Sequence, residues 1–112
     1  MDYEFMITDT PLPPCVPLPR AAVNLPISST AKVLYARLLG EILTNGIPDR
    51  NGILFIRFPI MELAAALSRS PMTVKRSLNE LEQAGMIMRV RRNVGEANHI
   101  YILLPKEGDS YE

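Results

Sequence analysis

Residues 68–85, SRSPMTVKRSLNELEQAG, hold the signals that decide the fold of this chain. Ser70 is a favoured N-cap residue, and Pro71 suits the first helical position because its missing N–H would have no partner there. Gly85 is a typical residue after a helix end. The helix predicted between them carries apolar residues at three- and four-residue spacing, namely Val74, Leu78 and Leu81.

A shorter helix is predicted directly upstream. Pro59 suits its start, and about two turns of apolar residues follow at positions i, i+3, i+4 and i+7, namely Ile60, Leu63, Ala64 and Leu67. Two short helices joined by a turn of three or four residues, the second better capped than the first, form a helix-turn-helix.

The residues beyond Gly85 predict a β-hairpin. Residues 86–92 and 99–104 have strand patterns, and the loop between them contains Asn and Gly. Residues 53–58, ILFIRF, supply a third short strand after the turn-forming residues 48–52. We therefore predict an α+β, mainly helical fold: a winged helix-turn-helix with a small antiparallel sheet.

The N-terminal half adds a helix and an arm. Ser28, Ser29 or Thr30 can cap a helix whose apolar stripe is broad enough to be covered on two sides, and Asn45-Gly46 ends it, with Gly46 expected in the left-handed conformation. Six of the ten prolines lie in the first 26 residues, so this stretch is expected to be irregular and free of helix. The predicted organisation is a Pro-rich arm over 1–27, one domain over 28–105 and a flexible tail over 106–112.

Composition narrows the class of protein. The chain has 112 residues, 12 Lys and Arg against 12 Asp and Glu, one His and one Cys. It lacks the pattern of a signal peptide, and no apolar run approaches the roughly 20 residues of a membrane span, so we expect a cytoplasmic protein. The charge is uneven, because residues 57–104 hold seven basic and four acidic side chains. The positive charge therefore lies on the predicted helix-turn-helix and hairpin.

Catalytic chemistry is not expected. A single Cys and a single His give neither a disulfide nor a metal cluster, and the chain has no phosphate-binding glycine loop and no nucleophile motif. We predict a protein that is not an enzyme and has no metal or cofactor.

The second helix of a helix-turn-helix enters the major groove of DNA with its polar face. Arg pairs with guanine, Asn with adenine, and Ser70 with the first free N–H groups can hold a phosphate oxygen. A solvated helix face with no partner would show the same residue types. The candidate contacts on the turn and helix are Arg69, Ser70, Met72, Thr73, Lys75, Arg76 and Asn79.

The hairpin supplies a second set of candidates. Alternation places Met88 and Val90 on one face of the first strand and Arg89 and Arg91 on the other. Arginines at a hairpin tip can enter a narrow minor groove or hold flanking phosphates, although a charged edge strand that resists aggregation has the same composition. The candidate contacts here are Arg89, Arg91, Arg92 and Asn93.

Several stretches resemble one known family. STAKVLYARLL (29–39), the Asp-x-x-Gly turn at Asp49 and Gly52, and the closing Ile-Tyr at Ile100 and Tyr101 are similar to the N-terminal domain of plasmid replication initiator protein A. The resemblance covers about residues 18 to 105. It implies a winged helix that binds repeated sites at a replication origin, usually as a dimer. We therefore expect a homodimer on a repeated or palindromic site in double-stranded DNA, with host replication proteins as possible further partners.

Two alternative functions remain. A complete initiator of this family typically has a further C-terminal region, so the same domain could serve a truncated initiator, a winged-helix transcriptional repressor or an accessory regulator of a mobile element. A winged helix can also act as a protein interaction module, with the basic face bound to an acidic partner.

Overall fold

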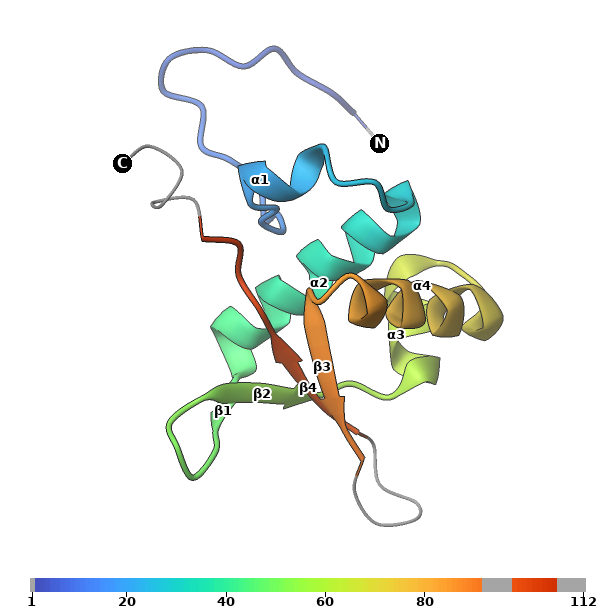
Figure 1. Ribbon diagram of the computed structural model, residues 1–112. Helices are drawn as coiled ribbons and strands as arrows, with labels where there is room; N and C mark the ends of the chain where they lie inside the picture. The colour runs from blue at the N-terminus through green and yellow to red at the C-terminus, as the bar shows by residue number, and fades with distance from the viewer. Residues whose placement is uncertain (1, 92–97, 107–112) are drawn as a thin grey trace.

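The computed structural model describes residues 2–91 and 98–106. Along these residues the chain forms four helices and one four-stranded sheet (Figure 1). Their bounds are α1 Arg20–Val23, α2 Ser29–Asn45, β1 Ile47–Pro48, β2 Leu54–Arg57, α3 Ile60–Leu67, α4 Pro71–Gln83, β3 Ile87–Val90 and β4 His99–Ile102. None of the helices in these two stretches combines the length and the apolar character that crossing a membrane requires.

The α2 helix forms the centre of the core. Ser28 caps it by accepting a hydrogen bond from the backbone N–H of Ala31 at 3.1 Å. The helix ends at Gly46 as predicted, but the expected left-handed conformation is wrong, because Gly46 has φ −60° and ψ 139°. A Cβ at Gly46 would lie 2.5 Å from the carbonyl oxygen of Ile42. Glycine therefore suits this position because a side chain would have no space there, and not because the backbone is left-handed.

The sheet has the strand order β1-β2-β4-β3, and all its pairs are antiparallel. The hairpin strands β3 and β4 are confirmed, with Ile87 opposite Ile102 and Val90 opposite His99. The predicted strand 53–58 is present as β2. The sequence did not predict β1, which pairs with β2 across a tight turn.

The Asp49 carboxylate holds that turn together. It accepts hydrogen bonds from the backbone N–H groups of Asn51 at 2.8 Å and Ile53 at 2.9 Å, and Gly52 adopts φ 81°. The Tyr101 hydroxyl donates to the same carboxylate at 3.0 Å. Two of the motifs that carry the family resemblance are therefore in direct contact.

The Pro-rich arm departs from the prediction in one place. The expectation that it contains no helix is wrong, because α1 forms one short helix within it. The interval between Pro19 and Pro26 has no proline, and α1 buries Ala22 completely. Upstream, Val16 and Pro17 lie near Gly40 of α2, since a Cβ added at Gly40 would meet their side chains at 3.5 Å. The second half of the arm thus covers one side of α2.

The other side of α2 packs on α4, and α4 also packs on α3. The residues that fill the space between these three helices and the sheet are all buried and apolar. They include Leu34, Tyr35, Leu38, Ile56, Leu63, Val74, Leu78, Leu81, Ile87 and Ile100. This core fixes which face of α4 is left to the solvent.

Candidate nucleic-acid interface

The turn between α3 and α4 begins at a residue with an unusual backbone conformation. Ser68 ends α3 in the left-handed conformation, at φ 54° and ψ 46°, and its backbone N–H donates to the carbonyl groups of Ala64 and Ala65. This conformation is uncommon for a residue other than glycine. The left-handed conformation of Ser68 ends α3 and begins the turn to α4.

The start of α4 is capped as predicted. Ser70 Oγ accepts a hydrogen bond from the backbone N–H of Thr73 at 3.1 Å and donates to the Thr73 hydroxyl at 3.0 Å. Pro71 occupies the first turn. Ser70 is exposed and Thr73 is half-buried, so the capped N-terminus of α4 is open to a ligand from the solvent.

The rest of α4 has two distinct faces. Val74, Leu78 and Leu81 are at most 2% exposed, which confirms the predicted inward stripe. The outward face carries Met72, which is 64% exposed, and the exposed residues Lys75, Arg76 and Asn79. Among the described residues, Lys75 and Arg76 have no ion-pair partner.

The two acidic residues of α4 are held by partners inside the domain. Glu80 accepts hydrogen bonds from the hydroxyl of Ser28 at 2.7 Å and from its backbone N–H at 2.8 Å, and these bonds hold the pKa of Glu80 below its ordinary value. Glu82 pairs with Arg89 at 2.7 Å, which likewise lowers the pKa of Glu82. Both carboxylates remain ionised at neutral pH. Glu82 lines the same cleft as Lys75, and its charge there is offset by Arg89.

The Arg89 guanidinium connects the hairpin to α4. Its Nε and Nη2 donate to Glu82 Oε1 at 2.9 and 2.7 Å, and Nη2 also donates to Asn79 Oδ1 at 2.7 Å. Arg89 follows buried Ile87 by two residues, so its side chain lies on the helix side of the sheet, whereas Met88 is 48% exposed on the other side. Two predicted contact residues, Arg89 and Asn79, are therefore bonded to each other.

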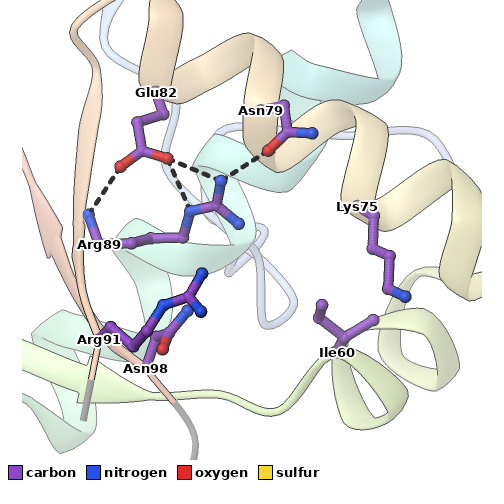
Figure 2. A pocket seen from close by; sticks show the side chains of 7 residues that line it. All are labelled: Ile60, Lys75, Asn79, Glu82, Arg89, Arg91 and Asn98. Atoms are coloured by element: carbon purple, nitrogen blue, oxygen red, sulfur yellow. Dashed lines mark hydrogen bonds and ion pairs between the residues drawn. The ribbon is translucent and has the colours of Figure 1, made fainter.

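A cleft of about 380 Å³ lies between α4 and the hairpin strands (Figure 2). Its floor and walls come from Ile60, Lys75, Asn79, Glu82, Arg89, Arg91 and Asn98. Three of these side chains are cationic and one is anionic, and the anionic one is already bound to Arg89. The cleft therefore has an excess of positive charge and of hydrogen-bond donors.

The predicted residues other than Ser70, Thr73 and Arg89 fall into three groups. Met72, Lys75, Arg76 and Asn79 share the outward face of α4, and Arg91 joins Lys75 and Asn79 at the cleft. Arg69 lies in the turn, where its Nη1 donates to the carbonyl of Ser68 at 3.2 Å. Arg92 and Asn93 lie outside the described residues.

Sequence reasoning did not select three of the residues at the cleft: Ile60, Glu82 and Asn98. Ile60 was predicted only as part of the apolar stripe of its helix, and Asn98 gave no signal in the sequence. Glu82 gave a signal, because an acidic residue at the end of α4 lies seven residues before the basic Arg89 at the start of the hairpin. In the described stretches 2–91 and 98–106, His, Cys, Asp and Glu side chains form no group of three or more that could bind a metal.

The order of elements, a helix-turn-helix followed by a two-stranded wing and completed by β2, defines a winged-helix protein. The family model for the N-terminus of replication initiator protein A (RepA) matches residues 22–107. The chain belongs to this family, which confirms the resemblance seen in the sequence. Among curated proteins, none matches the chain.

Solved structures share the fold. One described as "Structure of MDR initiator" superposes with a TM-score of 0.69 at 23% identity, covering 88% of this chain and 84% of its own. A second, described as "N-Terminal domain of DNA binding protein", superposes with a TM-score of 0.64 at 23% identity and covers 77% of this chain and 70% of its own. A third, described as "Structure of Rep-DNA complex", superposes with a TM-score of 0.62 at 21% identity and covers 71% of this chain and 64% of its own.

Proposed function

We propose that this chain binds double-stranded DNA in a sequence-specific manner, as the origin-reading domain of a replication initiator. The observation that carries the proposal is the outward face of α4, where Met72, Lys75 and Arg76 are exposed while the opposite stripe is buried. Membership of the initiator family and a solved relative described as a Rep-DNA complex support it.

In this proposal α4 lies in the major groove and Arg91 lies beside the flanking backbone. Lys75 and Arg76 supply charge that no acidic side chain of the described residues neutralises. The capped N-terminus of α4 faces a phosphate oxygen, since the backbone N–H of Met72 and the positive end of the helix dipole attract negative charge. The same arrangement of α4 and Arg91 can bind a replication origin or an operator. Repeated binding sites in the DNA indicate an origin, and a single palindrome indicates an operator.

The test is fluorescence anisotropy with duplex DNA over a series of salt concentrations. The double variant Lys75→Ala/Arg76→Ala is compared with Arg20→Ala/Arg50→Ala, which removes the same charge from exposed positions outside α4 and β3. We expect the first to reduce the slope of log K against log salt by about 1.8, at about 0.9 per phosphate contact, and the second to leave it unchanged. Equal effects from both variants, or negligible affinity of the unaltered protein at low salt, would contradict the proposal.

We further propose that the protein acts as a homodimer on a repeated or palindromic site. One protomer with about four phosphate contacts binds weakly at cellular salt, and a second protomer doubles the electrostatic contribution. Val33 and Leu43 on α2 are 54% and 70% exposed and offer apolar surface for pairing. Sedimentation at high protein concentration should show a dimer. A protein that stays monomeric at every concentration, and also when bound to DNA, would contradict the proposed homodimer.

A further inference from the structure

The hydrogen bonds around Arg89 fix the orientation of the Asn79 amide. A guanidinium group has five N–H donors and no acceptor, so the atom of Asn79 that meets it at 2.7 Å must be the oxygen. The opposite end of the amide, Nδ2, is turned away from Arg89, as Figure 2 shows. Arg89 in turn is held by Glu82 through its Nε, its Nη2 and its backbone N–H.

Asn79 therefore offers mainly donors to a ligand. The residue is exposed, and within the described residues its Nδ2 has no hydrogen-bond partner. An unconstrained Asn reads adenine with both ends of the amide, because Oδ1 accepts from the N6 amino group while Nδ2 donates to N7. Here Oδ1 already accepts a charge-assisted bond, and an adenine amino group would approach a guanidinium that carries positive charge.

Guanine fits this arrangement better. Its major-groove edge presents two acceptors, N7 and O6, and no donor. Nδ2 of Asn79 can donate to N7, and the positive charge on Arg89 attracts the O6 oxygen instead of repelling an amino group. Asn79 also lines the cleft with Lys75, another group that only donates.

We propose that Asn79 is a specificity-determining residue that reads a guanine in the major groove, and that Arg89 and Glu82 are positioning residues that set this preference. The inference rests on the proposed function, because it requires α4 to lie in the groove of a duplex. Residue type alone predicts that Asn79 reads adenine. The hydrogen bond from Arg89 to the Asn79 oxygen favours guanine instead.

The experiment is selection of bound sites from a random duplex library, with the unaltered protein and two variants. Asn79→Ala removes the amide from an exposed position and should leave the fold intact. Arg89→Met/Glu82→Gln frees the Asn79 oxygen without leaving an unpaired carboxylate, and thermal melting checks that it folds. We expect one guanine in the selected site whose preference over adenine is about tenfold, is lost in Asn79→Ala, and shifts toward adenine in the double variant.

A second measurement replaces that guanine with 7-deazaguanine in the selected duplex. The unaltered protein should lose about fivefold in affinity and Asn79→Ala should lose none. Three results would overturn the inference: base preferences that Asn79→Ala leaves unchanged, a position dependent on Asn79 that is adenine in the unaltered protein, or a uniform loss of affinity across sequences, which indicates a phosphate contact. In each of these the protein still binds duplex DNA, so the proposed function survives, whereas absence of binding at low salt overturns both.

Discussion

Replacement of Ser70 tests whether the cap of α4 supports both the fold and the proposed interface. In Ser70→Ala the backbone N–H of Thr73 loses its acceptor at 3.1 Å and the Thr73 hydroxyl loses its donor. Loss of an N-cap costs about 1 kcal/mol, within a range of about 0.5–2. Water can replace the missing oxygen because Ser70 is exposed, so we expect the lower half of that range.

Urea denaturation followed by circular dichroism measures this cost. With a slope of about 1.5 kcal/mol per molar for a domain of this size, the midpoint should fall by about 0.5 M with no change in slope. Ser70→Asp is the matched variant, because a carboxylate also caps the helix and favours the positive end of its dipole. It should restore the midpoint, yet lower DNA affinity about tenfold, since it places negative charge where the phosphate is proposed to lie.

Two results would refute this reasoning. An unchanged midpoint in Ser70→Ala would show that the cap contributes nothing to stability. A Ser70→Asp protein that binds DNA as tightly as the unaltered one would show that no phosphate approaches this helix end.

Three further predictions concern stability. Tyr35→Phe should lower the free energy of unfolding by about 1–2 kcal/mol in thermal melts, because the Tyr35 hydroxyl donates to the Leu103 carbonyl at 2.7 Å from a buried ring. Gly46→Ala should cost about 1–3 kcal/mol in urea titrations, since the new Cβ would meet a backbone oxygen at 2.5 Å. Arg89 lowers the pKa of Glu82, so the stability from this pair is present above the ordinary carboxyl pKa of 4.5 and is lost as pH falls through the lower folded value. Glu82→Gln should therefore flatten the acid limb of stability against pH, and an unchanged acid limb would contradict the role of the pair.

The helices and the buried stripe of α4 were predictable because their signals are local. Ser70, Pro71 and Gly85 mark the ends of α4, and the 3.6-residue period marks its inner face. The short elements α1 and β1 were not predictable, because two to four residues carry no period and form only through the core and the strand they pack on.

The candidate site was predictable only in part, for a related reason. Alternation separates Met88 from Arg89 but does not say which face meets α4, and only packing shows that Arg89 reaches Asn79 and Glu82. The bond between Ser28 and Glu80 joins residues 52 positions apart and has no sequence signal. Residue type therefore identified the polar face of α4, while the structure identified how its charges are paired.

The central claim, that the outward face of α4 meets DNA, is tested most directly by titrating ¹⁵N-labelled protein with a duplex and following backbone amide shifts. The largest changes should fall on Ser70–Asn79 and on Arg91, while residues of β1 and the turn at Arg50, on the opposite edge of the sheet from β3, should stay unchanged. Changes centred on β1 and Arg50, or none on α4 when the duplex is saturating, would contradict the account.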